Sequence, residues 1–387
     1  MEHFFAPCPR GLEAMLAQEL AGLGATGIKR TDGGVQFSGP YELAYRANLE
    51  SRIASRILWR VAAAPYRTED DIYRATLALD WPRWFDAGDT LRVNLAAHRC
   101  PLKSLDFVTL RIKDAVCDKF RSCGGRRPSI DTHRPDVRLH AFLSVDQLML
   151  YLDTSGEPLF KRGYRRAAGE APLRENLAAG ILRLTGWTPD VALLDPMCGS
   201  GTFLIEAALI ALDIAPGAWR NFGFEKLKNF ERTAWDRIKA GGRSRERPRV
   251  ALPIYGSDLY GEELKTARAN LDAAGLQEVI QLKQANVLEM PAPAASGVIV
   301  TNPPYGVRLG GTEQLREFYP KLGDALKQKF SGWRAYILSS DLNLPKLIRL
   351  ADSKRTPLYN GALECRLYEF KLVAGSMRRV KPVKGEG

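Results

Sequence analysis

The chain has 387 residues, 45% of them hydrophobic, and a formal net charge of +12. This length exceeds what one compact domain usually needs, so we expect two or three domains. No apolar run is long enough to span a membrane, which excludes a membrane-embedded protein. The basic surplus favours a polyanionic partner such as a nucleic acid.

Six cysteines are scattered along the chain without a Cys-x-x-Cys pair, and only four histidines are present. We therefore expect no disulfide framework, no structural zinc and no catalytic metal. A reducing, cytoplasmic compartment fits this cysteine usage. The first residues, Met1–Phe5, lack the basic and apolar regions of a secretory signal.

The N-terminal part, residues 1–64, predicts a helix over about 12–23, ended by Gly24 and followed by a strand. A second helical pattern covers about Tyr41 to Arg60. Its four arginines are expected on one broad face: Arg46, Arg52, Arg56 and Arg60. This face is either solvated or in contact with an RNA backbone.

Residues 65–166 predict a small α+β module. The expected elements are a helix over 71–79, a strand over 90–97, a helix over 105–121 and alternating strands over 137–143 and 148–152. Four cations surround one aromatic residue at its end, where cations can bind phosphates and the ring can stack on an unpaired base. The candidate RNA-binding residues are Lys161, Arg162, Tyr164, Arg165 and Arg166. The alternative is a basic interdomain linker.

Residues 167–387 alternate between strand and helix, which is typical of a parallel, doubly wound sheet. Strands are expected at 191–195, 251–257, 279–283, 297–301, 334–339 and 365–373. The segment 226–249 interrupts this rhythm with nine Lys/Arg and three Asp/Glu. We expect it to be an exposed insertion, partly disordered or facing RNA.

The first motif of this region is a buried strand that ends in an acid, followed by a glycine-rich turn and a helix. Its residues are Asp195, Pro196, Met197, Cys198, Gly199, Ser200, Gly201 and Thr202. Small residues at the carboxyl end of a strand let a ligand approach the backbone closely. The pattern is not Gly-x-Gly-x-x-Gly, and no Walker lysine follows.

The second motif is Asp258, which ends the next predicted strand. A carboxylate there can accept both ribose hydroxyls of a nucleoside ligand. The alternative is a helix N-cap, because a helix is predicted to start near Gly261.

The third motif is Asn302-Pro303-Pro304-Tyr305, directly after a predicted strand. Prolines remove backbone donors and leave carbonyl oxygens free, and Asn302 adds a side-chain oxygen. Two such acceptors can hold the hydrogens of an aryl amine and point its lone pair at an electrophilic methyl group. Tyr305 can stack on the base, and alignment supplies much of the acceleration. A base in a structured nucleic acid must be flipped out to reach this pocket.

Together these motifs resemble the class I, seven-stranded, Rossmann-like methyltransferase fold, whose cofactor is S-adenosyl-L-methionine. The run 171–178 resembles an additional helix on the cofactor side in the same group. The resemblance implies catalytic roles for Asn302, Pro303, Pro304 and Tyr305. It implies cofactor contacts for Glu175, Asp195, Pro196, Cys198, Gly199, Ser200, Gly201, Thr202, Asp258, Leu259, Asn286, Val287 and Asn302.

Asn286 departs from the family pattern, which tends to have an aspartate there that contacts the adenine. Its side-chain oxygen can still accept a hydrogen bond from the adenine amine. We therefore expect at most a modest loss of cofactor affinity.

Nearly the whole chain resembles the THUMP-containing, UPF0020-type RNA methyltransferases, and within them the group of ribosomal RNA large subunit methyltransferase L. This implies a ferredoxin-like domain at 1–64, a THUMP RNA-binding domain at 65–166 and a methyltransferase domain at 167–387. The implied reaction is methylation of a guanosine N2 amine in 23S rRNA, free or in a large-subunit assembly intermediate. No obligate protein partner is implied.

Other substrates remain open, because a tRNA guanine, a DNA adenine and a protein glutamine all present an amine or amide nitrogen. The basic α+β module favours RNA without separating rRNA from tRNA. A hypothesis of a different class is a non-catalytic RNA-binding factor for ribosome assembly. The presence of Asn302 and Asp258 argues against it.

Overall fold

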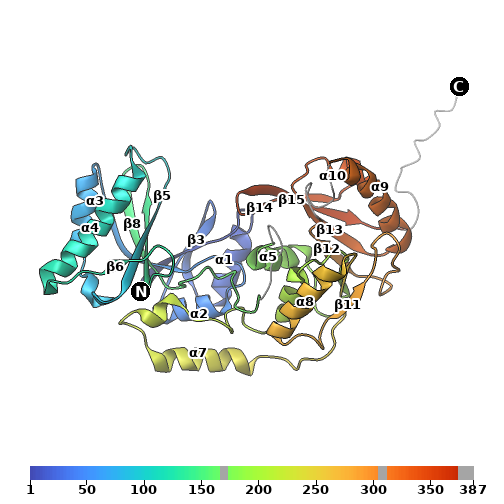
Figure 1. Ribbon diagram of the computed structural model, residues 1–387, viewed down its shortest axis with the longest axis horizontal. Helices are drawn as coiled ribbons and strands as arrows, with labels where there is room; N and C mark the ends of the chain where they lie inside the picture. The colour runs from blue at the N-terminus through green and yellow to red at the C-terminus, as the bar shows by residue number, and fades with distance from the viewer. Residues whose placement is uncertain (166–172, 304–311, 374–387) are drawn as a thin grey trace. The chain divides into compact units, whose positions relative to one another are not determined.

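The computed structural model describes residues 1–165, 173–303 and 312–373, which form two compact units (Figure 1). The first unit comprises residues 1–163 and 213–246, and the second comprises 164–212 and the residues from 247 onward. No helix in the described ranges is long and apolar enough to cross a bilayer.

The first unit begins with the order β-α-β-β-α-β. Its elements are β1 (Glu2–Pro7), α1 (Glu13–Gly22), β2 (Thr26–Thr31), β3 (Gly34–Gly39), α2 (Glu42–Glu50) and β4 (Leu58–Pro65). The strands lie in the order β2-β3-β1-β4, which is the arrangement of a ferredoxin-like half. Leu16 and Leu20 of α1 and Phe4 of β1 are fully or almost fully buried, so they form part of its core.

The helix expected over 41–60 is confirmed only in its first half. Helix α2 ends at Glu50, and β4 begins at Leu58. The four arginines therefore do not share a helix face: Arg52 is buried and donates to the Ile214 carbonyl at 2.8 Å, and Arg56 pairs with Asp153. The apolar residues between positions 53 and 58 fit both the period of a helix and the period of a strand. The pairing of β4 with β8 stabilises the strand in the folded protein.

The second half of this unit continues the same sheet. Its elements are α3 (Glu69–Leu77), the 3-10 turn η1 (Trp81–Arg83), β5 (Thr90–Ala97), α4 (Leu105–Gly124), β6 (Ser129–Ile130), β7 (Val137–Leu143) and β8 (Gln147–Asp153). Strand β4 pairs antiparallel with β8, so one eight-stranded sheet joins the two halves. Thr68 and Ser104 cap α3 and α4 with their side chains.

The basic segment predicted as an exposed insertion is ordered in the first unit. It contains η2 (Gly223–Lys226) and α7 (Arg232–Ser244), and α7 contacts α2. Trp235 of α7 is buried, and its ring packs edge-on against Phe222 and Phe224 at 5.6 and 5.1 Å between centroids. The Tyr45 hydroxyl also accepts a hydrogen bond from the Glu231 amide at 3.0 Å. This segment therefore lies within the sequence of the third expected domain but packs with the first unit.

The second unit is built on a seven-stranded sheet. Its elements are α5 (Glu175–Thr185), β9 (Leu193–Asp195), α6 (Thr202–Ala211), β10 (Ile254–Asp258), α8 (Gly261–Ala274), β11 (Gln281–Gln284), β12 (Val298–Thr301), α9 (Thr312–Lys329), β13 (Arg334–Ser339), α10 (Leu344–Ile348), β14 (Lys354–Asn360) and β15 (Leu363–Lys371). The strands lie in the order β11-β10-β9-β12-β13-β15-β14. The first five are parallel and β15 is antiparallel to both neighbours.

Helices cover both faces of this sheet, as Figure 1 shows for α8 and α9. Trp333, Phe330 and Tyr368 belong to a buried cluster that joins α9 and α10 to β12, β13 and β15. Strand β14 was not expected from the sequence, since Pro357 and three charged or polar neighbours obscure it. It is an edge strand, where a proline costs no pairing on the open side.

Candidate active site

The glycine-rich loop between β9 and α6 is fixed mainly by backbone hydrogen bonds. Gly199 and Gly201 have φ angles of 49° and 79°, which favour glycine. The Gly201 amide donates to the Cys198 carbonyl at 2.8 Å, and the Cys198 amide donates to the Ser257 carbonyl of β10 at 2.9 Å. The loop is therefore anchored to the neighbouring strand by its backbone.

Asp258 links this loop to the turn that follows β10. One carboxylate oxygen accepts from the Gly199 amide at 2.9 Å, and the other accepts from the Tyr260 amide at 3.1 Å. Tyr260, and not Asp258, occupies the N-cap position of α8. The helix-cap alternative is therefore excluded, and each oxygen keeps a lone pair beyond these bonds.

Asp195 is almost completely buried at the end of β9. Burial raises the pKa of this carboxyl to about 7, and the charge of Asp258 adds to the shift, while the Thr301 hydroxyl and the Met197 amide oppose it. The Met197 amide donates to the carboxyl at 3.3 Å. Asp195 thus supports the turn through the Met197 amide, and its burial favours the protonated form.

The ends of three parallel strands bring the predicted motifs to one edge of the sheet. Asp195 of β9 lies opposite Gly256 of β10, two residues before Asp258. On the other side β9 pairs with β12, which ends at Thr301, so Asn302 follows at the same edge. Asn302 is partly exposed, while Pro303 is buried. Pro304 and Tyr305 lie outside the described residues.

Asn286 and Val287 follow β11, the outermost strand of this edge. The Asn286 side chain accepts from the Leu288 amide at 3.0 Å and donates to Glu289 at 3.0 Å. These bonds hold it in a local turn, and its oxygen retains one lone pair for a ligand. Val287 is buried, whereas Leu259, next to the ribose-acid candidate, is 51% exposed.

Glu175 and Thr202 are joined by a residue that the sequence assigned to RNA binding. The Arg165 guanidinium forms an ion pair with buried Glu175 at 2.8 Å and donates to the Thr202 hydroxyl at 2.9 Å. Arg165 therefore ties α5 to the first residue of α6. Its side chain is used for this contact between two elements of the predicted cofactor site.

Burial argues against the RNA contacts predicted for two of its neighbours. Arg162 is 1% exposed, and it donates to the carbonyls of Leu159 and Arg52 at 3.0 and 2.7 Å. Tyr164 is 2% exposed, with its hydroxyl 3.5 Å from Glu206, so its ring is not available for stacking.

Lys161 remains at the surface, where it pairs with Glu157 at 2.7 Å. Arg166 lies outside the described residues. Of the described members of this basic group, only Lys161 is therefore exposed enough for direct contact with a polyanion.

Asn270 on α8 supports the site but was not predicted from the sequence. Asn270 is 1% exposed and donates to the Ser200 carbonyl at 3.1 Å, which braces the glycine-rich loop from a second helix. Its position between Ala267 and Leu271 on an apolar helix face was the available signal. Within the described ranges, no three His, Cys, Asp or Glu side chains gather as metal ligands would.

Three family models match successive parts of the chain. The RlmL ferredoxin-like domain matches residues 3–58, the THUMP domain matches 66–153, and the RMKL-like methyltransferase domain of UPF0020 matches 162–369. The chain belongs to the UPF0020 methyltransferase family. The expected fold is confirmed: a ferredoxin-like and THUMP region precedes a class I S-adenosylmethionine-dependent methyltransferase fold.

Relatives within this family extend over the whole chain. A protein of Shewanella sp. strain W3-18-1, named ribosomal RNA large subunit methyltransferase K/L, is 41% identical over 100% of this chain and 55% of its own length. The chain thus spans about half the length of that relative. The Synechocystis protein slr0064, whose name places it among RNA methyltransferases, is 40% identical over 95% of this chain and 96% of its own length.

A solved structure is similar over nearly the whole chain. The methyltransferase-like protein SMU.472, crystallised with SAH, is 32% identical, with a TM-score of 0.86 over 97% of this chain and 99% of that chain. Because the likeness covers both chains, the two units described here occur together in that protein.

Proposed function

We propose that this chain transfers a methyl group from S-adenosyl-L-methionine to the exocyclic N2 amine of a guanosine in 23S rRNA. The observation that carries the proposal is the edge of the second sheet, where the glycine-rich loop, Asp258 and Asn302 follow three adjacent parallel strands. Ligands of open α/β sheets bind at such an edge.

The cofactor would use three parts of this edge. Asp258 accepts the ribose hydroxyls with its remaining lone pairs, and exposed Leu259 offers an apolar surface to the adenine. Asn286 accepts from the adenine amine, and the loop 195–202 lets the methionine portion approach the backbone. Glu175, held by Arg165, supports the same end of the site from α5.

The substrate amine would be held by the Asn302 side-chain oxygen and a carbonyl of the adjoining proline segment. Both amine hydrogens are then engaged, so the nitrogen lone pair points at the sulfonium methyl. The nitrogen–carbon bond forms as the carbon–sulfur bond breaks, S-adenosylhomocysteine leaves, and the nitrogen releases one proton. Stacking on Tyr305 fixes the flipped base.

The choice of large-subunit ribosomal RNA is supported by the name of a relative and by the THUMP match. The choice of the guanine N2 amine follows the family resemblance of the sequence motifs. Because the chain spans 55% of the K/L relative, the assignment of that protein's substrate to this chain is part of the proposal. A tRNA guanine would use the same chemistry and is the second candidate.

The test is label transfer from methyl-labelled S-adenosylmethionine to unmodified 23S rRNA, tRNA and DNA in separate reactions. We expect label in 23S rRNA and a loss of about 100-fold for Asn302→Ala. Asn343→Ala, an exposed asparagine of the same unit, is the matched control and should retain its activity. Label in tRNA alone would overturn the substrate, and equal activity of Asn302→Ala would overturn the catalytic assignment.

A further inference from the structure

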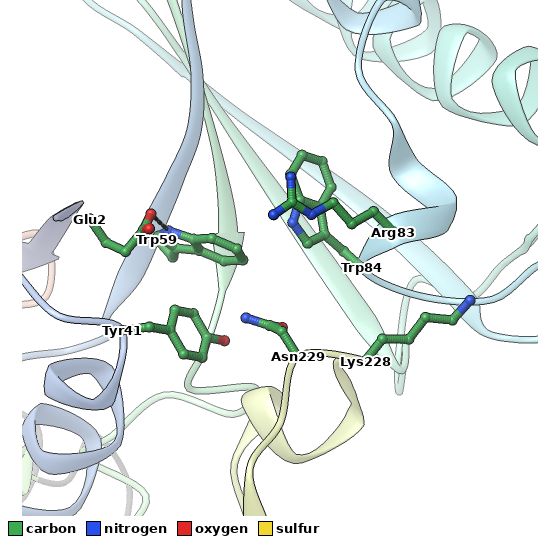
Figure 2. Close-up of a pocket in the computed structure, with 7 residues that line it drawn as sticks. All are labelled: Glu2, Tyr41, Trp59, Arg83, Trp84, Lys228 and Asn229. Atoms are coloured by element: carbon green, nitrogen blue, oxygen red, sulfur yellow. Dashed lines mark hydrogen bonds between the residues drawn. The ribbon is translucent and has the colours of Figure 1, made fainter.

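The first unit contains a pocket of about 230 Å³ that is separate in sequence from the three motifs (Figure 2). We call it the Tyr41 pocket. It is lined by Glu2, Tyr41, Trp59, Arg83, Trp84, Lys228 and Asn229. The ferredoxin-like half, the turn η1 and the basic segment 226–249 each contribute part of the lining.

Its aromatic wall is rigid. The Tyr41 ring packs against Trp59 with centroids 4.8 Å apart at 70°, and Trp59 packs against Trp84 at 6.0 Å and 82°. Trp59 and Trp84 are 8% and 9% exposed, so neighbouring side chains fix both rings. The rings bound the pocket on one side in Figure 2, and a planar ligand could lie against them at little entropic cost.

Polar groups in the pocket have unused hydrogen-bonding capacity. The Asn229 side-chain oxygen is buried and accepts no hydrogen bond from the part of the chain that the structure describes. A buried acceptor without a donor is unfavourable, so a ligand N–H would stabilise it. Burial raises the pKa of the Tyr41 hydroxyl beside this amide, which keeps it protonated as a donor.

Glu2 adds a fixed acceptor. The Trp59 indole N–H donates to one of its carboxylate oxygens at 2.8 Å, which holds the carboxylate at the pocket. A carboxylate, an amide and a phenol together offer both donors and acceptors, as the edge of a nucleobase requires.

The mouth of the pocket is cationic. Arg83 is exposed, and its side chain forms no ion pair or hydrogen bond with any residue in the described ranges. Lys228 is held by the Pro82 carbonyl at 3.0 Å and Asp86 at 2.6 Å, and it belongs to the basic segment 226–249. Positive charge beside an aromatic pocket suits a base whose phosphates remain outside.

We propose that the Tyr41 pocket binds one unpaired base of the RNA, at a site other than the one where methyl transfer occurs. The base lies against the aromatic wall, its edge bonds to Asn229 and Glu2, and Arg83 contacts a flanking phosphate. The proposal takes RNA as the partner from the proposed function. Its consequence is that the basic segment and the THUMP half select an unpaired element of the substrate together.

The test measures the affinity of the full chain for a labelled unpaired oligoribonucleotide of about 12 nucleotides by fluorescence anisotropy. The variants are Arg83→Ala and Asn229→Ala. Arg30→Ala is the matched control, because Arg30 is an exposed arginine of the same unit on β2. We expect each pocket variant to weaken binding about fivefold and the control to change it less than about twofold.

A second probe has the same sugar-phosphate backbone without bases. If the pocket binds a base, Arg83→Ala should lower the affinity for both probes, whereas Asn229→Ala should affect only the probe with bases. Equal affinities of both pocket variants and the control would overturn the proposal. It would also be overturned if Asn229→Ala lowered the affinity for the abasic probe as much as for the probe with bases. Thermal unfolding identifies a folding defect in Asn229→Ala. In that case Asn229→Leu, which removes the acceptor but keeps the size of the side chain, takes its place in the comparison of the two probes.

The outcomes separate this proposal from the proposed function. RNA binding that is insensitive to both variants removes the pocket and leaves the methyltransferase assignment intact. Failure of the wild-type chain to bind any RNA probe removes RNA as the partner and the pocket with it. Neither result depends on the measurement of methyl transfer.

Discussion

The two units place their polar groups in different ways. In the second unit the candidate residues follow strands that are adjacent in the sheet, and backbone hydrogen bonds fix them without long side-chain networks. In the first unit the Tyr41 pocket gathers residues from positions 2 to 229, and aromatic packing fixes them. Each motif of the strand-end site is thus encoded by a local sequence pattern, whereas each part of the candidate recognition pocket is recognisable only in the tertiary structure.

The largest expected effect tests whether α7 belongs to the first unit. Trp235→Ala should destabilise that unit by about 3–5 kcal/mol, because it removes a buried ring packed on Phe222 and Phe224. Urea unfolding monitored by circular dichroism measures it. Arg237→Ala on the exposed face of the same helix should change stability by less than about 1 kcal/mol. A small effect of Trp235→Ala would show that α7 contributes little to this unit.

The next effect concerns the cofactor. Asp258→Ala should weaken S-adenosylmethionine binding about 30-fold, because the ribose loses its acceptors and the Gly199 amide loses its partner. Isothermal calorimetry is the measurement. Asp272→Ala, an exposed aspartate on α8, should bind like the wild type. Equal affinity of Asp258→Ala would remove the ribose assignment.

A substitution of Arg165 tests whether its side chain has a structural role or contacts RNA. Arg165→Ala leaves buried Glu175 without its cation, so we expect a loss of about 2 kcal/mol in stability, less than for a fully buried pair because Arg165 is partly exposed. Adding Glu175→Gln should recover part of that loss in a double-mutant cycle. A variant with full stability but weaker RNA binding would restore the role predicted from the sequence.

The smallest effect is the pH dependence of Asp195. Its folded pKa of about 7 exceeds the ordinary value of 3.8, so the folded state binds the proton more tightly than the unfolded state. This contribution to stability is complete below about pH 4 and is lost as the pH rises towards 7. Between pH 6 and 8 the wild type should therefore lose about 1–2 kcal/mol more than Asp195→Asn. Parallel pH profiles of the two proteins would contradict the shift.

The sequence predicted the second unit better than the first, for a physical reason. Asp195, Asp258 and Asn302 each follow an apolar strand, so a local pattern specifies both the strand and the residue at its end. Arg162 and Tyr164 are buried because they bond to a carbonyl and a carboxylate of segments distant in the sequence. A local sequence pattern does not predict such bonds. Strand β14 was missed because an edge strand tolerates Pro357 and charged residues.

The Tyr41 pocket and the packing of α7 were not predicted for the same reason. The sequence showed a basic segment, 226–249, but its fixed position comes from aromatic residues that meet only after folding. The composition of this segment therefore predicted its positive charge, but not the part of the fold against which it packs.

The most direct test of the account identifies the product nucleoside. RNA methylated by the wild-type chain is digested completely, and the labelled nucleoside is identified by mass and by comparison with standards. We expect N2-methylguanosine from 23S rRNA with the wild-type chain and none with Asn302→Ala. N6-methyladenosine, or no labelled nucleoside despite cofactor binding, would contradict it.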